Sequence, residues 1–142
     1  MLLLLLIYGQ LFALDKESTL KFYQHIFTAI TTANPVLVYV EDPEYREVFM
    51  GVDKILLAKH MKESDVVLLT NETMLEKVLN LQEVEKPLLF ATDYHILAAS
   101  KDVIGAFYWK KGRAQLLFVE SRLKAHDIVL SPEYKKFIID EL

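Results

Sequence analysis

Polar side chains suited to acid–base or metal chemistry stand directly after three apolar runs of the sequence. The four candidates are Asp42, Asn71, Asp93 and His95. If the apolar runs are parallel strands, these residues meet at the carboxyl ends of the strands, where open α/β sheets bind ligands. Carboxylates at this crevice, with Glu41 beside them, could bind Mg²⁺ or share a proton. The same residue types cap helices and turns that follow strands, and we favour capping for Asp42, Asn71 and Asp93.

Little else in the sequence is typical of an enzyme. There is no nucleophile elbow around any serine, no dinucleotide-binding glycine motif and no phosphate-binding loop. The four histidines are scattered without the i, i+4 spacing of a metal site, and the chain has no cysteine. We therefore expect a non-enzymatic protein with no cofactor and no metal. A small hydrolase or transferase that uses Asp42, Asp93 and His95 stays open as an alternative.

The length and charge of the chain limit the number of domains and the kind of partner. The chain has 142 residues, is 53% hydrophobic and 25% charged, and carries a net charge of −4. This length suits one domain with a substantial core. Its largest basic cluster is Lys110, Lys111 and Arg113, which is too small for a nucleic-acid footprint. We expect no nucleic-acid partner.

The N-terminal segment is strongly apolar. Between Leu2 and Leu14 only Gly9 and Gln10 interrupt the apolar residues, and charge begins at Asp15. This length is too short to span a bilayer and suits the apolar region of a signal peptide. No basic residue precedes the run, so a first buried strand or helix is the alternative. We expect a signal peptide-like segment at 1–14, a single domain at 15–142 and a periplasmic location, with a cytoplasmic one as the alternative.

Strand-like and helix-like segments alternate along most of the chain. We expect helices at 19–32, 44–50 and 71–81, strands at 36–40, 54–60, 65–70 and 87–93, and a terminal helix that begins at Ser131-Pro132-Glu133. Strands that are apolar on both faces indicate a sheet covered on both sides. The predicted fold class is therefore α/β, a three-layer, Rossmann-like and mostly parallel sheet flanked by helices, with a C-terminal β-hairpin and a terminal helix.

The hairpin is predicted from two apolar runs, 103–109 and 114–119, that leave no room for a helix between them. A loop of three to five residues with Gly112 at a positive φ would connect them. Strict alternation would place Ile104, Ala106 and Tyr108 on one face and Val103, Gly105, Phe107 and Trp109 on the other.

The tip of this hairpin is the candidate surface for a partner. Tyr108 and Trp109 lie next to the turn, where helices cover a sheet least well. They could pack under the terminal helix with Tyr134 and Phe137, which we favour because aromatic residues usually serve cores. The alternative is an exposed aromatic patch with basic residues at its rim, which is the composition of an interface hot spot. The partner-binding candidates are Tyr108, Trp109, Lys110 and Arg113.

Part of the chain resembles a response-regulator receiver domain. "VLVYVEDPEYRE" is similar to the receiver strand that ends in an acidic pair, and "KPLLFATDYH" to the strand that ends in the switch threonine, here Thr92. "SDVVLLTN" resembles the strand of the phospho-acceptor aspartate, but Thr70 stands at that position. This resemblance implies a degenerate cytoplasmic receiver-like adaptor without phosphoryl chemistry.

A second resemblance covers more of the chain. "VIGAFYWKKGRAQLLFVESRLKAHDIVLSPEYKKFI" resembles the C-terminal signature of the YfiR family, through Ile104-Gly105, Gly112-Arg113, the apolar strand after them and Ser131. "LKFYQHIFTAI" and the Asp42-Pro43 strand end fit its first half. The resemblance implies a periplasmic, non-enzymatic regulator that binds an inner-membrane sensor protein, through the periplasmic domain of a diguanylate cyclase or histidine kinase, and so a role in cyclic di-GMP signalling. A homodimer stays open.

Overall fold

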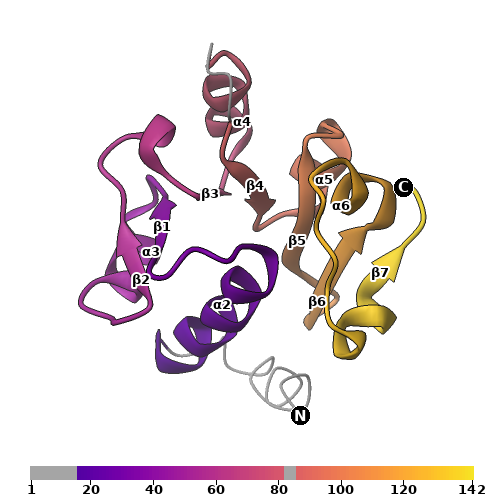
Figure 1. Ribbon diagram of the computed structural model, residues 1–142, viewed down its shortest axis with the longest axis horizontal. Helices are drawn as coiled ribbons and strands as arrows, with labels where there is room; N and C mark the ends of the chain where they lie inside the picture. The colour runs from indigo at the N-terminus through magenta and orange to yellow at the C-terminus, as the bar shows by residue number, and fades with distance from the viewer. Residues whose placement is uncertain (1–15, 82–85) are drawn as a thin grey trace.

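A seven-stranded sheet runs through the part of the chain that the computed structural model describes, residues 16–81 and 86–142 (Figure 1). Its strands are β1 (Val36–Tyr39), β2 (Ile55–Leu57), β3 (Val66–Leu69), β4 (Leu88–Ala91), β5 (Val103–Lys110), β6 (Arg113–Val119) and β7 (Ile138–Ile139). Their order is β2-β1-β3-β4-β5-β6-β7, and β1 to β5 are parallel. β6 is antiparallel to β5, and β7 is parallel to β6. The sheet is therefore mostly parallel.

Helices cover both faces of this sheet. They are α2 (Lys16–Ile30), α3 (Pro43–Phe49), α4 (Glu72–Leu79), α5 (Tyr94–Ala99) and α6 (Glu120–Ala125), with 3₁₀ turns η1 (Met61–Glu63) and η2 (Pro132–Phe137). Residues of α2 and α3 belong to one buried cluster, and residues of α4 and α5 to another. In Figure 1, α2 lies on one side of the central strands and α4 on the other. The predicted three-layer, Rossmann-like α/β fold is confirmed.

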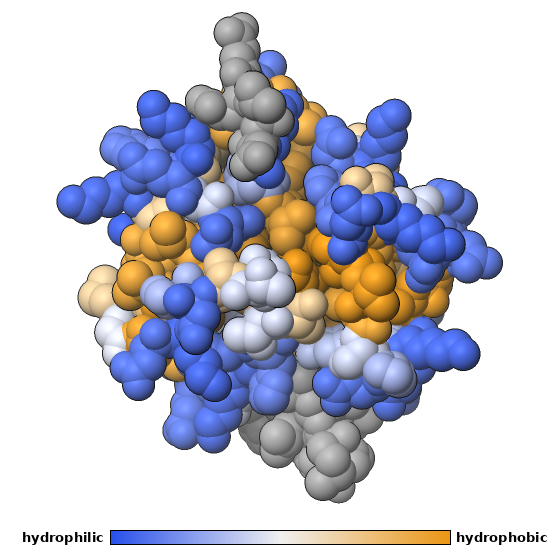
Figure 2. All heavy atoms as spheres, in the orientation of Figure 1, coloured by the Kyte–Doolittle hydropathy of each residue, from blue (hydrophilic) through white to orange (hydrophobic). Residues whose placement is uncertain are grey.

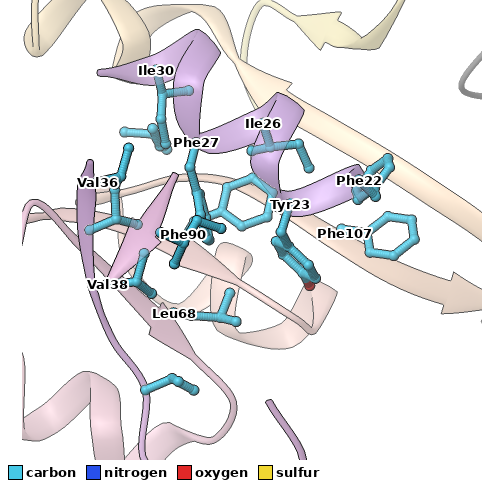
Figure 3. Packing of buried hydrophobic residues seen from close by; sticks show 14 of the residues in the cluster. Phe22, Tyr23, Ile26, Phe27, Ile30, Val36, Val38, Leu68, Phe90 and Phe107 are labelled. Atoms are coloured by element: carbon cyan, nitrogen blue, oxygen red, sulfur yellow. The ribbon is translucent and has the colours of Figure 1, made fainter. Parts of the chain in front are cut away.

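The core under α2 is rich in aromatic side chains (Figure 3). Phe22, Tyr23, Ile26, Phe27 and Ile30 are all buried, because this spacing places them on one stripe of the helix. Their side chains pack against aromatic and β-branched residues of the strands beneath. Burial of each large side chain stabilises the fold by roughly 1.5–3 kcal/mol. This stripe fixes α2 across the sheet.

The described strands in the middle of the sheet are apolar on both faces. All four residues of β3 are buried, with Val66 and Leu68 in the cluster under α2 and Val67 and Leu69 in the cluster under α4 and α5. This is the pattern that a doubly covered parallel strand requires. The strand predictions from continuous apolar runs are therefore confirmed.

The predicted terminal helix begins where expected, at Pro132 after Ser131, but it is a short 3₁₀ helix and not an α-helix. Residues 132–137 form the 3₁₀ turn η2, after which Ile138 and Ile139 pair with Phe118 and Val119 of β6. The Ser131 hydroxyl makes no capping hydrogen bond to η2, although the Ser131 carbonyl accepts one from the Tyr134 amide at 3.0 Å. Because the outer edge of β6 offers backbone partners to the apolar residues that follow, the helix ends at Phe137 and a short strand continues the chain.

The hairpin is present, but its turn is tighter than expected. Lys110 pairs with Arg113, so the loop has the two residues Lys111 and Gly112, with φ values of 51° and 76°. Two positive φ values in a two-residue loop match the type I′ turn, whose twist suits a β-hairpin. Both residues adopt this conformation. Gly112 does so without strain because it has no Cβ atom, whereas a positive φ is unfavourable for Lys111.

The expected alternation of side chains fails at the start of β5. Leu89 pairs with Val103, but Phe90 pairs with Gly105, so β5 carries one extra residue at this point. Such a bulge moves the side chains that precede it to the opposite faces of the sheet. Val103 therefore packs on the same face as Ala106, and Ile104 on the same face as Phe107. Beyond the bulge, alternation holds.

Candidate functional site

The tip of the β5–β6 hairpin projects beyond the carboxyl edge of the parallel strands. Ala91, the last residue of β4, pairs with Ala106, whereas β5 continues to Lys110. The last four residues of β5 therefore have β6 as their sheet neighbour, and no strand within residues 16–81 and 86–142 pairs with them on the β4 side. All the partner-binding candidates lie in this hairpin.

Trp109 is exposed at the tip. Its side chain retains 43% of its accessible surface, whereas Phe107, two residues earlier on the same face, is buried. The predicted packing of Trp109 under the terminal segment with Tyr134 and Phe137 is wrong. Tyr134 packs on Phe118 with ring centroids 6.1 Å apart, and Trp109 lies beside α2 and α3 instead. The exposed-aromatic alternative describes Trp109 correctly.

Tyr108 lies on the opposite face of β5 from Trp109. Its ring centroid is 5.6 Å from that of Tyr94, the first residue of α5, and its side chain is half-buried. Burial raises the pKa of the Tyr108 phenol, and the neighbouring Tyr94 raises it further. Tyr108 and Trp109 thus lie on opposite faces of the hairpin, Tyr108 beside α5 and Trp109 beside α2 and α3.

A cavity of about 580 Å³ brings together members of both predicted groups. Residues from the strand-end group and from the hairpin group line it, namely Thr92, Asp93, Tyr94, His95, Tyr108, Trp109 and Lys110. The hairpin tip forms one wall, and the β4–α5 connection forms the other. Asp42, Asn71 and Arg113 do not line this cavity.

The predicted capping roles are confirmed. The Asp42 carboxylate accepts hydrogen bonds from the amides of Glu44, at 2.8 Å, and Tyr45, at 3.4 Å. Asn71 Oδ1 accepts one from the Met74 amide at 2.9 Å. These side chains satisfy first-turn amides that no helical carbonyl reaches.

Asp93 acts in the same way at α5, where its carboxylate accepts a hydrogen bond from the His95 amide at 2.7 Å. His95 itself is exposed. No group of three His, Asp or Glu side chains placed to hold a metal occurs within residues 16–81 and 86–142. The strand-end residues therefore have structural partners.

The crevice between β1 and β3, where the strand order reverses, is also occupied by local contacts. Glu41 accepts a hydrogen bond from the Tyr39 hydroxyl at 2.9 Å and forms an ion pair with Lys77 at 3.2 Å. Such a switch point is the usual ligand site of an open α/β sheet. Here the described cavities lie farther along the edge, beside the end of β5.

A second cavity, which the sequence did not predict, lies on the α2 and α3 side of Trp109. Its volume is about 520 Å³, and its lining includes Tyr23, Tyr45 and Phe107. The one signal in the sequence was a tyrosine on the apolar stripe of α2, where a hydroxyl is out of place. Trp109 lines both cavities.

The fold and the two cavities define an α/β protein with an aromatic hairpin tip at the carboxyl edge of its sheet. No protein-family model matches the chain, and no curated protein or solved structure matches it either. The resemblance to the YfiR family therefore remains a prediction. Among the described residues, no helix has the length and apolar composition needed to cross a bilayer.

Proposed function

We propose that this chain is a non-enzymatic regulatory protein that binds a partner protein through the tip of the β5–β6 hairpin. The exposed side chain of Trp109 carries the proposal. Tryptophan is the residue type most enriched among interface hot spots, since it offers a large rigid surface to a partner. An indole left 43% exposed on a paired strand is available for such a contact.

The charges around Trp109 indicate the chemistry of the partner surface. Lys110, Lys111 and Arg113 are exposed and surround the turn, without an acidic residue among them. A basic rim around an aromatic centre favours a partner with an apolar pocket bordered by carboxylates. Rim charges of this kind mainly speed association and exclude wrong partners.

A second exposed apolar residue, Val129, competes for this role. It lies between α6 and η2 and is 92% exposed. Figure 2 shows apolar spheres on the face of the molecule where this segment lies. A single valine provides less contact area than an indole and has no comparable basic rim, so we favour the hairpin tip.

The engagement of the strand-end side chains supports a binding role over catalysis. Asp42 and Asp93 use their carboxylates to cap helices, which leaves them fewer lone pairs for acid–base chemistry. The resemblance to the YfiR family supports a periplasmic location and an inner-membrane sensor protein as the partner. We take the periplasmic domain of a diguanylate cyclase or histidine kinase as that partner.

One observation favours the alternative, a cytoplasmic receiver-like adaptor. The first five strands have the order β2-β1-β3-β4-β5, which is that of flavodoxin-like folds. Two features differ from that pattern. A helix, α2, precedes β1, and the antiparallel strand β6 follows β5. Thr70, at the place of the phospho-acceptor, has a hydroxyl where a carboxylate is needed.

Site-specific photo-crosslinking in the native host tests the proposal. A photoreactive amino acid is placed at Lys110 in the tip, at Lys101 before the other end of β5, or at Val129. All three positions are exposed. We expect a covalent adduct with an inner-membrane signalling protein from position 110, and none with that protein from the other two.

Three outcomes would contradict the proposal. An adduct at Val129 alone would move the interface to the segment between α6 and η2. Adducts with cytoplasmic proteins alone would favour the adaptor alternative. A second copy of this chain as the sole adduct at position 110 would make the tip a homodimer contact.

A further inference from the structure

The strand β2 forms one edge of the sheet, and its outer side has no partner. It stands at the end of the order β2-β1-β3-β4-β5-β6-β7, and no strand within residues 16–81 and 86–142 pairs with that side. In Figure 1 it lies at the left end of the sheet. The free amides and carbonyls of such an edge can pair with a further strand. The residues of β2 and its two ends decide which strand fits.

The pairing with β1 determines which backbone groups of β2 face outward. Lys54 and Ala58 bond to β1, through the Lys54 carbonyl at 3.0 Å and the Ala58 amide at 2.8 Å. The amide and carbonyl of one residue point to the same side of a strand, and that side alternates from residue to residue. Ile55 and Leu57 therefore direct their amides and carbonyls to the outer edge.

The side chain of Leu56 makes this edge apolar. It is 49% exposed, whereas Ile55 and Leu57 point to the other face of the sheet and pack in the cluster under α2. Leu37, its neighbour on β1, is half-buried. Figure 2 shows apolar spheres at the side of the molecule where β2 lies. Free backbone groups beside an exposed leucine favour association with another strand.

Charged residues at the two ends of β2 are complementary to a second copy of the same strand. Asp53 lies two residues before Ile55, and Lys59 lies two residues after Leu57. Both charged side chains are exposed, and neither forms an ion pair with the described residues. An antiparallel copy centred on Leu56 places Asp53 of each chain opposite Lys59 of the other. Opposite charges at directly opposed positions stabilise a pair of strands.

The same register also satisfies the free backbone groups. Residues that face the partner strand form the hydrogen-bonded pairs of an antiparallel ladder, and here Ile55 of each chain pairs with Leu57 of the other. Leu56 then lies opposite Leu56 in a non-hydrogen-bonded pair, where side chains approach most closely. Centring the pair on Ile55 or on Leu57 would keep backbone bonds but would move Asp53 away from Lys59.

We propose that the chain forms a homodimer by antiparallel pairing of β2 with β2 of a second copy, about a twofold axis at Leu56. One continuous sheet then runs through both copies. A lysine on an edge strand usually prevents such pairing. Here Lys59 selects the register instead, because Asp53 of the second copy lies opposite it. A foreign strand without an acidic residue at that position leaves Lys59 unpaired.

The dimer keeps both hairpin tips free. The strands β1, β3 and β4 separate β2 from β5. Because antiparallel pairing reverses the strand direction of the second copy, the two tips lie at opposite edges of the joined sheet. Each dimer therefore offers two separate tips, a consequence that rests on the proposed function, whereas the contact between the β2 strands does not.

Sedimentation equilibrium of the purified full chain tests the proposal. The contact has few residues a side compared with the roughly 20–30 of a stable interface, so we expect a reversible dimer with a dissociation constant on the order of 100 μM. Leu56→Lys places like charges directly opposite each other and should abolish this dimer. Val129→Lys, the same kind of change at an exposed apolar position between α6 and η2, should leave it unchanged.

Charge reversal tests the register. Asp53→Lys and Lys59→Asp each oppose like charges at two places of the dimer, and each should weaken it about tenfold. The double variant Asp53→Lys with Lys59→Asp restores opposite charges, so its dissociation constant should return to that of the wild type.

A single introduced thiol locates the twofold axis, because the chain has no cysteine of its own. The Cα atoms of a non-hydrogen-bonded antiparallel pair lie about 4.5 Å apart, which is within the range of a disulfide. Leu56→Cys should therefore form an intermolecular disulfide on mild oxidation. Lys54→Cys, an exposed position two residues earlier, should not form one.

A chain that remains monomeric at the highest concentration reached would overturn the proposal. A dimer that Leu56→Lys and Val129→Lys weaken equally would overturn the assignment to β2. Equal linking of Leu56→Cys and Lys54→Cys, or a double charge variant that stays as weak as the single variants, would overturn the register. None of these results depends on the hairpin tip or its partner.

Discussion

The rings of Phe107 and Trp109 lie 6.3 Å apart on the same face of β5, yet Phe107 is 6% exposed and Trp109 is 43% exposed. Two residues along one strand therefore separate the core from the surface. The transition occurs because β5 continues past the end of β4.

This relationship predicts unequal effects of truncating the two side chains. Phe107→Ala should lower the free energy of unfolding by about 3–5 kcal/mol, since it leaves a cavity in the core. Trp109→Ala should lower it by about 1 kcal/mol or less, because exposed positions contribute little. Denaturant unfolding followed by circular dichroism measures both. A loss above about 3 kcal/mol for Trp109→Ala would place the indole in the core.

Burial of Tyr23 predicts a stability difference at high pH. Its pKa is raised well above the ordinary value of about 10, mainly by burial, so the folded chain holds the phenol proton more tightly than the unfolded chain. The stability due to this group is thus complete below pH ~10 and is lost as the pH rises further. Tyr23→Phe should unfold at a higher alkaline pH than the wild type.

The comparison is a melting temperature measured between pH 8 and pH 11.5 for the wild type, Tyr23→Phe and Thr28→Ala. The third variant is a control on an exposed position of α2. If the melting curves of wild type and Tyr23→Phe fall in parallel with pH, ionisation of Tyr23 has no part in alkaline unfolding.

Arg122 joins α6 to the start of β5 and to the end of α5. Its guanidinium donates to the carbonyls of Leu97 at 2.7 Å, Ser100 at 3.0 Å and Val103 at 2.9 Å. Arg122→Ala should lower the free energy of unfolding by about 2–4 kcal/mol, because these carbonyls lose a charged donor. Chemical denaturation should show no comparable loss for Arg113→Ala, an exposed arginine. Similar losses of unfolding free energy for Arg122→Ala and Arg113→Ala would mean that the three hydrogen bonds of Arg122 do not stabilise the fold.

Gly105 of β5 pairs with Phe118 of β6. A Cβ atom at this position would meet the Leu117 carbonyl oxygen and a Phe118 ring carbon, each at 2.7 Å. Gly105→Ala should therefore destabilise the fold by about 1–3 kcal/mol through overpacking. Differential scanning calorimetry of this variant beside Ala98→Gly, an exposed site in α5, checks the prediction. An unchanged melting temperature for Gly105→Ala would contradict it.

The sequence predicted the layers and the strands well, because runs such as 66–69 are apolar on both faces and have few other stable arrangements. It also predicted the capping roles of Asp42, Asn71 and Asp93, which depend on contacts within three residues. Local signals were therefore sufficient wherever the partners are close in the chain.

Features that depend on distant contacts were not predicted. The strand at Ile138 forms because β6 has a free edge, and the bulge at Ile104 appears only in the pairing with β4. The cavity beside Trp109 requires α2, α3 and β5 together. No spacing within one segment encodes such a juxtaposition.

The central claim is that the hairpin tip binds a membrane sensor protein through Trp109. The most direct measurement is the affinity of the purified sensor domain captured at position 110 for the wild-type chain, for Trp109→Ala and for Val129→Ala. We predict that Trp109→Ala weakens binding at least about 30-fold, as expected of a hot spot worth 2 kcal/mol or more, with a nearly unchanged melting temperature. An affinity that Trp109→Ala leaves unchanged, or that Val129→Ala reduces as strongly, would contradict the claim.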